Sequence, residues 1–118
     1  MTTVTNSTGS IFLSHRAIAT IASQATLESY GVVGLTAKNV ASGLTQSLVK
    51  DPTMGVDVEF EENSVTIDLY IIVEYGTRIK SVATSVAENV KYRVENTTGL
   101  SVNHVNVHIR GLRISNTD

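Results

Sequence analysis

Residues 55–76, GVDVEFEENSVTIDLYIIVEYG, decide the fold of this chain. Val56, Val58 and Phe60 alternate with acidic residues, which is the period of two expected of a strand with one solvated face. Residues 62–64 supply a turn, and a second alternating run follows it, with apolar residues at positions 65, 67, 69, 71, 73 and 75. The stretch therefore predicts a β-hairpin whose two strands share one buried face.

The second strand of this hairpin is apolar on its other face as well. Tyr70 and Ile72 lie between the positions of the buried face, where a sheet with one solvated face would carry polar residues. Either another element of the fold or a second molecule must cover them.

Composition sets the class of protein. A chain of 118 residues with 42% hydrophobic residues is long enough to bury one core and predicts a single domain. The net charge of −2 and the lack of a basic run argue against nucleic acid as a partner. The absence of cysteine excludes disulfides, thiolate metal sites and a cysteine nucleophile.

No segment of the sequence has the features of a signal peptide or a transmembrane helix. The first residues, MTTVTNSTGS, have neither the basic start nor the apolar run of a signal peptide. The longest apolar run, Leu69–Val73, is far shorter than the roughly 18 residues of a transmembrane helix. We therefore expect no direct membrane insertion.

The N-terminal half predicts a tail, a short strand and two helices. Residues 1–8 are polar and are expected to form a mobile tail. A strand over 10–13 leads to Ser14, a typical helix N-cap, and to a first helix that ends before Gly31. Its apolar face consists of Ile18, Ile21, Ala22 and Ala25. A second helix is expected from residue 38 to about residue 49.

The C-terminal half predicts a long helix and a last strand. Thr77 is the expected N-cap of the helix and Gly99 its end. Its apolar stripe comprises Ile79, Val82, Ala83, Val86, Val90 and Val94. Val105, Val107 and Ile109 then alternate with polar residues in the strand.

These elements follow the order β-α-α-β-β-α-β. That order predicts an α+β fold, with helices on one face of a mainly antiparallel sheet of about four strands. The predicted domain spans residues 9–114, and residues 115–118 form a C-terminal tail.

The sequence contains no recognisable catalytic or metal centre. His104 and His108 lie four residues apart, but on a strand this spacing separates their backbones by roughly 13 Å, too far for one zinc ion. No Gly-x-Ser-x-Gly elbow occurs among the many hydroxyl residues. We therefore expect neither enzymatic activity nor a cofactor.

A nucleic-acid alternative comes from the Gly31–Gly34 segment. Its sequence, GVVG, matches the bare Gly-x-x-Gly of KH modules and falls between two predicted helices. The two central valines lack the polar or basic character that such a phosphate-binding loop usually has. A KH-like RNA-binding module remains a weaker alternative.

A surface for partners is predicted on the face of the sheet away from the main core. It places an apolar centre within a polar rim, as interaction patches often do. Its residues are Asp68, Tyr70, Ile72, Glu74, His104, Asn106, His108 and Arg110. We expect self-association or partner binding through this face.

Three segments resemble the alkaline shock protein family of Gram-positive bacteria. They are IDLYIIVEYG at 67–76, AENVKYRVENTTGL at 87–100 and VNVHIRGLRI at 105–114. The wider similarity covers Ser10–Leu35 and Val65–Ile114, and it concerns core and turn residues rather than a catalytic motif.

This resemblance implies a non-enzymatic cytoplasmic protein of the envelope, or general, stress response. Such a protein would form homo-oligomers and lie against the inner face of the membrane through a membrane-anchored protein partner. The alternative that the resemblance implies is a regulator that binds an enzyme of fatty-acid or phospholipid metabolism.

Overall fold

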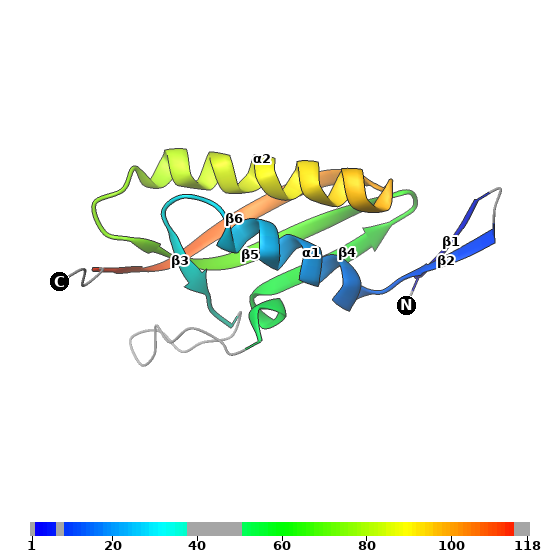
Figure 1. Ribbon diagram of the computed structural model, residues 1–118, viewed down its shortest axis with the longest axis horizontal. Helices are drawn as coiled ribbons and strands as arrows, with labels where there is room; N and C mark the ends of the chain where they lie inside the picture. Colours follow the sequence, from blue (N-terminus) through cyan, green and yellow to red (C-terminus); the bar gives the residue numbers. More distant parts are fainter. Residues whose placement is uncertain (1, 7–8, 38–50, 115–118) are drawn as a thin grey trace.

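The computed structural model describes residues 2–6, 9–37 and 51–114. Two helices pack on one face of a four-stranded sheet, so the predicted α+β class is confirmed (Figure 1). The elements, in chain order, are β1 (Thr2–Asn6), β2 (Gly9–Leu13), α1 (His15–Leu27), β3 (Val32–Leu35), the 3₁₀ helix η1 (Pro52–Gly55), β4 (Val56–Glu61), β5 (Ser64–Glu74), α2 (Ile79–Thr98) and β6 (Ser101–Arg113).

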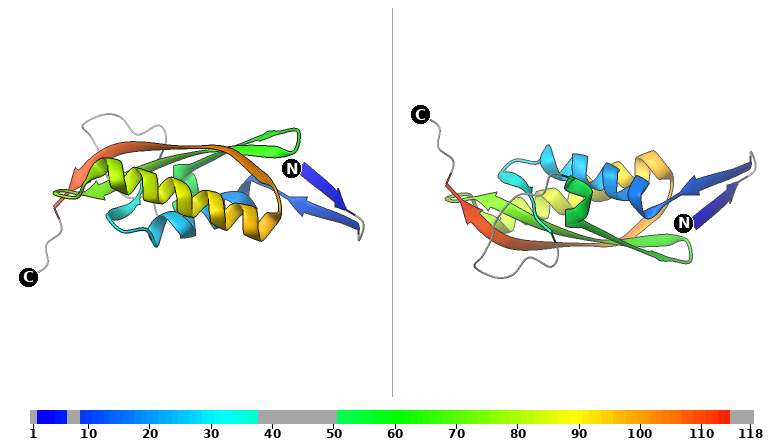
Figure 2. Two further views of the ribbon diagram at one scale, coloured as in Figure 1. Left: turned by 90° about the horizontal axis from the view of Figure 1, so that it is seen from above. Right: turned by 90° about the horizontal axis from the view of Figure 1, so that it is seen from below.

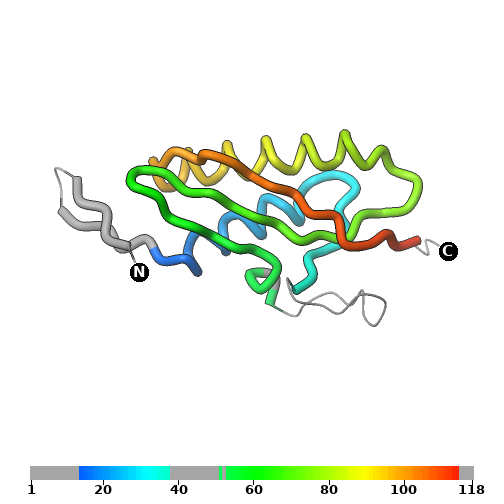
Figure 3. The backbone as a smooth tube through the Cα atoms, turned by 180° about the vertical axis from the view of Figure 1, so that it is seen from behind, coloured from blue at the N-terminus to red at the C-terminus, as the bar shows by residue number. Residues whose placement is uncertain are grey.

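Strand β5 is the centre of the sheet. Along one edge it pairs antiparallel first with β4, which matches Glu61 with Ser64, and further on with β3, which matches Leu35 with Ile71. Along its other edge it pairs over its whole length with β6 (Figure 3). The predicted hairpin is therefore β4–β5, and the sheet is mainly antiparallel, as expected.

The pairing of β5 with β6 is parallel, which requires a crossover connection between them. Helix α2 provides that connection and lies across the sheet on the same side as α1 (Figure 2). Gly99 ends the helix with a left-handed φ of 79°, as the sequence predicted. The Val102 N–H then donates to the Glu95 carboxylate at 2.9 Å, which fixes the turn into β6.

The core lies between the helices and the sheet. The predicted inner face of β5, from Val65 to Val73, is fully buried, and so is the α2 stripe of Val86, Val90 and Val94. From α1 the core receives Ile18, Ala22 and Ala25, with Ile21 packed at its margin. Each large aliphatic side chain buried in this way contributes about 1.5–3 kcal/mol.

Two residues that the periodic pattern assigned to the core are exposed. Tyr75 is 64% exposed and Ile79 is 42% exposed, because β5 ends at Glu74 and α2 begins only at Ile79. The prediction that Thr77 is the N-cap of α2 is also wrong. Arg78 occupies that position without a side-chain bond, whereas the Thr77 hydroxyl donates to the Glu74 carbonyl at 2.7 Å.

The N-terminal segment agrees with the sequence in part. Ser14 caps α1 as predicted, since its hydroxyl accepts from the Ala17 N–H at 3.1 Å. Residues 2–6, which we expected to belong to a mobile tail, form β1 and pair with β2. The helix predicted over 38–49 and the tail predicted at 115–118 lie outside the described residues.

Gly31 is a position where only glycine fits. Its φ is +88°, and a Cβ placed there would lie 2.6 Å from Val82 Cγ2. Gly76 has a similar φ of +96°, but a Cβ there would meet nothing within 4 Å. The two glycines therefore separate the cost of the backbone conformation from the cost of a clash.

We predict that Gly31→Ala lowers the free energy of unfolding by about 2–4 kcal/mol, the sum of a backbone and a packing cost. Gly76→Ala should lose only the backbone part, about 1–2 kcal/mol. Urea unfolding followed by circular dichroism measures both. In a Val82→Ala background, Gly31→Ala should cost less than it does in the wild-type protein, because the clashing methyl group is gone. Equal losses for Gly31→Ala and Gly76→Ala would contradict the clash.

Candidate functional site

The face of the sheet opposite the helices carries the predicted partner surface. We call it the outer face and define it by residues 66, 68, 70, 72 and 74 of β5 with residues 104, 106, 108 and 110 of β6. Neither helix of the described chain lies on this side (Figure 3). Parallel register places the two sets side by side, since Tyr70 pairs with His108 and Asp68 with Asn106.

A cluster of polar and aromatic side chains occupies the middle of the outer face. The rings of Tyr70 and His108 stack with centroids 4.6 Å apart and planes within 10° of parallel. The Arg110 guanidinium carbon lies 5.2 Å from the Tyr70 ring centroid, within range of a cation–π contact. His108 Nε2 lies 2.9 Å from Asp68 Oδ1. We call these four residues the Tyr70 cluster.

The apolar residues of the outer face are buried within the single chain. Tyr70 is only 7% exposed and Ile72 is fully buried, so no second molecule is needed to cover them. His104, Asn106 and Arg110 are exposed, while Asp68, Glu74 and His108 are half-buried. The surface offered to a partner is therefore polar, without the exposed apolar centre that the sequence suggested, and its role in binding stays a prediction.

Together with the residues of β4 on the same side of the sheet, the outer face divides into an acidic half and a basic half. Asp57 and Glu59 on β4, together with Asp68, Tyr70 and His108, line an open hollow of about 410 Å³. Across β5, strand β6 presents His104, His108 and Arg110. The partner surface predicted from the sequence did not include these acidic residues of β4, although the antiparallel register of the hairpin places Asp57 directly opposite Asp68.

The Tyr70 cluster does not have the geometry of a catalytic centre. A histidine oriented by an aspartate is part of the arrangement that activates a nucleophile. In the described part of the chain, however, His108 has no hydrogen bond to a hydroxyl group. The described residues contain no group of three or more potential metal ligands.

The hollow beside α1 is built by packing and capping interactions. It measures about 250 Å³ and lies next to Arg16, which pairs with Asp51 at 3.2 Å. A hydrogen bond from the Thr53 hydroxyl, more than the nearby Arg16, lowers the pKa of Asp51. Since the folded-state pKa is lowered, this bonding stabilises the fold above the ordinary aspartate pKa and is lost as the pH falls. His15 stacks edge-on against Phe60 at 4.8 Å, which is a packing contact.

The Gly-x-x-Gly segment does not form a nucleic-acid loop. Val32–Leu35 is strand β3, and its backbone is engaged with β5 through the pairing of Val32 with Val73. Such a loop must present its backbone to phosphates, and here that backbone belongs to the sheet. The KH-like interpretation of this segment is therefore wrong.

Neither helix of the described residues combines the length and apolar character that crossing a bilayer requires.

Comparison with known proteins places the chain among a group of related sequences. The sequence model of the alkaline shock protein 23 family, described as having a cell envelope-related function, matches residues 3–114. The uncharacterized protein YloU of Bacillus subtilis is 44% identical over 110 residues, covering 92% of either chain. The uncharacterized protein Spy1614 of Streptococcus pyogenes is 32% identical and covers 90% of this chain and 89% of its own length.

Solved structures share the fold at lower identity. A zinc form of a MamM CTD variant has a TM-score of 0.52 and 14% identity, over 86% of this chain and 90% of its own. Another MamM CTD structure has a TM-score of 0.51 and 13% identity, and is covered completely. Similarity at this level shows the fold alone.

We predict that Tyr70 and His108 are energetically coupled. A double-mutant cycle of Tyr70→Leu and His108→Ala should give a coupling free energy of about 0.5–1.5 kcal/mol, as for other stacked aromatic pairs. Urea unfolding of the four proteins supplies the values. His104→Ala is the control, because His104 lies two rows of the face away from Tyr70 and should combine additively with Tyr70→Leu, within about 0.5 kcal/mol. Additivity at His108 as well would show that the stack has no energetic role.

Proposed function

Because the chain belongs to the alkaline shock protein 23 family, which has a cell envelope-related function, we propose that it serves the envelope stress response as a non-catalytic protein that binds copies of itself and a protein partner. The observation that carries this proposal is the outer face. It is a broad, polar, charge-divided surface that no helix of the described chain covers.

The division of charge supports self-association. A two-fold axis produces an interface in which the same surface occurs on both copies, so the surface must complement itself. The acidic strand β4 and the basic strand β6 lie on opposite sides of β5. The surface therefore complements itself when the two-fold axis runs parallel to β5. Strand β4 of each copy then faces β6 of the other.

The register across the sheet makes this arrangement specific. Glu59 and His104 both pair with Thr66, so the three residues form one row across the face. The two-fold axis places Glu59 of one copy opposite His104 of the other. An imidazole N–H can donate to a carboxylate, so this contact is favourable and occurs twice in the dimer.

The polar character of the surface fits a reversible assembly. Tyr70 and Ile72 are already buried, so the interface does not need to cover a large apolar patch. Polar interfaces are typical of complexes whose subunits are stable alone. A protein that responds to envelope stress would use such an interface to exchange between copies of itself and a membrane-anchored partner at the inner face of the membrane.

Crosslinking in the native cell, followed by mass spectrometry of the adducts, tests the envelope role. Membrane-anchored or envelope proteins crosslinked to the outer face would support it. Adducts confined to enzymes of fatty-acid or phospholipid synthesis would instead indicate a regulator of lipid metabolism and overturn the envelope proposal.

For self-association we predict that Glu59→Lys weakens the dimer about tenfold, because it removes the carboxylate that accepts from His104 and places a cation against the strand that carries Arg110. Sedimentation equilibrium measures the dissociation constant. Combining Glu59→Lys with His104→Glu should restore the affinity, since the lysine then faces a carboxylate across the same contact. Glu88→Lys makes the same change on the exposed side of α2 and should leave the dimer unchanged. A wild-type protein that stays monomeric, or a double variant that is not restored, would rule out this interface.

A further inference from the structure

Exposed apolar side chains gather at one end of the molecule. Five of the eight large hydrophobic residues that are exposed in the described chain lie where β5 passes into α2 and where β6 ends. They are Tyr30, Tyr75, Ile79, Leu112 and Ile114. We call these residues, together with Arg78, Lys80 and Arg113, the β5–α2 end.

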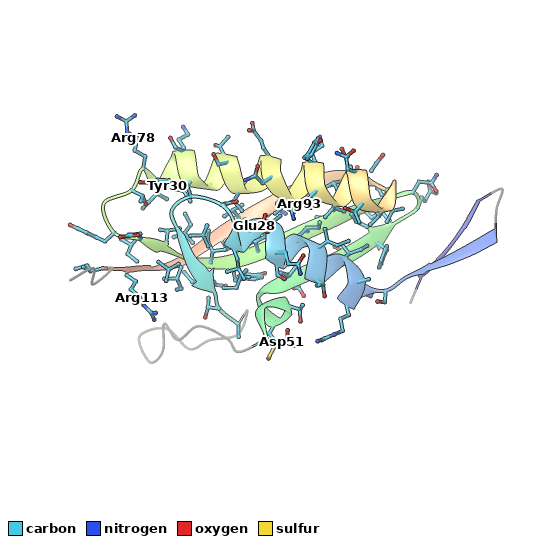
Figure 4. All side chains as sticks on the ribbon, in the orientation of Figure 1. Glu28, Tyr30, Asp51, Arg78, Arg93 and Arg113 are labelled. Atoms are coloured by element: carbon cyan, nitrogen blue, oxygen red, sulfur yellow. The ribbon has the colours of Figure 1, made fainter. Side chains whose placement is uncertain are left out.

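Three separate segments of the chain form this end. Tyr30, which is 83% exposed, lines an open hollow of about 300 Å³ together with Arg78. The Tyr75 N–H donates to the Arg113 carbonyl at 2.9 Å, which joins the β5–α2 turn to the end of β6. Figure 4 shows Tyr30, Arg78 and Arg113 projecting at the same end of the fold. The exposed side chains therefore surround the end and do not line a single groove.

The β5–α2 end is basic in a protein of negative net charge. Arg78 and Lys80 are exposed, and neither forms an ion pair in the described residues. The formal net charge of the whole chain is −2, so the two exposed cations contrast with the chain as a whole. The first turn of α2 also points its positive dipole end in this direction. Charge at this end complements an anionic surface.

We propose that the β5–α2 end rests directly on an anionic lipid bilayer. Tyrosine places an apolar ring at the bilayer boundary while its hydroxyl stays hydrated, and arginine and lysine reach the headgroups over their aliphatic stems. Clustered cations add attraction to anionic lipid. Side chains around an end of the molecule suit a fluid surface, which needs no shape complementarity, better than they suit a protein groove.

This contact goes beyond the proposed function, in which a protein partner brings the chain to the membrane. It involves no insertion of a helix, since only side chains reach the headgroup region. It also uses a different surface from the outer face, so the two can be tested separately.

Single tryptophan reporters test the contact. The chain has no tryptophan, so Tyr30→Trp and Tyr92→Trp each provide one probe. Tyr92 is 69% exposed on α2, about 20 Å along the helix from its first residue. Vesicles of phosphatidylcholine with phosphatidylglycerol should shift the emission of Tyr30→Trp to the blue and leave that of Tyr92→Trp unchanged. Vesicles of phosphatidylcholine alone should shift neither.

Sedimentation with the same vesicles gives the energetic test. Arg78→Gln and Lys80→Gln should each weaken binding about fivefold, the effect of roughly 1 kcal/mol per basic residue. Tyr30→Ser with Ile79→Ser should remove most of the apolar contribution. Lys91→Gln and Tyr92→Ser change the same residue types elsewhere on α2 and should leave binding intact.

Several results would overturn the proposal. These are failure of the wild-type protein to bind phosphatidylglycerol vesicles at low salt, binding that does not weaken with salt, and an equal blue shift for both tryptophan probes. Binding to an acidic polypeptide without a shift of Tyr30→Trp on vesicles would point to a protein partner instead. Glu59→Lys should impair self-association but not vesicle binding. The two proposals are therefore tested separately, and a failure of vesicle binding leaves the proposed function intact.

Discussion

The rest of the structure depends on the complete enclosure of β5. This strand is hydrogen-bonded on both edges, to β3 and β4 on one side and to β6 on the other. From Leu69 to Val73 its side chains are buried on both faces. A strand of this kind must be apolar throughout, which explains why its alternation stops at Tyr70. The two helices of the described chain cover only one face, and on the other face the His108 ring stacks on Tyr70 and contributes to its burial.

Parallel pairing with β6 is the second consequence of this central strand. A parallel neighbour requires a crossover, and α2 supplies it while covering the core with valines at every fourth residue. The close approach of Val82 to Gly31 shows how tightly the crossover is held at its start. The same pairing brings Asp68, Tyr70, His108 and Arg110 together, although forty residues separate Asp68 from His108. The Tyr70 cluster is thus a product of topology.

The sequence correctly predicted features that depend on interactions between residues close together in the chain. Ser14 caps α1 and Gly99 ends α2, because a capping hydroxyl and a left-handed glycine act within a few residues of themselves. The hairpin register was likewise accessible from the alternation of β4 and β5. The sequence could indicate that Tyr70 and Ile72 needed cover but not which atoms would supply it, since strand neighbours far apart in sequence are set by the crossover. The family resemblance is confirmed.

The two errors in the predicted core, Tyr75 and Ile79, have a common cause. Periodicity counts apolar residues without knowing where an element ends, and here β5 stops at Glu74 and α2 starts at Ile79. A residue that continues an apolar pattern past the end of its element gains nothing from the core, and its exposure costs solubility. Both residues fall at the β5–α2 end, next to Arg78 and Lys80. The proposed contact with an anionic bilayer would use both the apolar side chains that the fold leaves exposed and Arg78 and Lys80, which form no ion pair within the described residues. The same periodic pattern of apolar residues therefore supplies both the core and the β5–α2 end. The turn at Gly76 separates the buried residues of the pattern from the exposed ones.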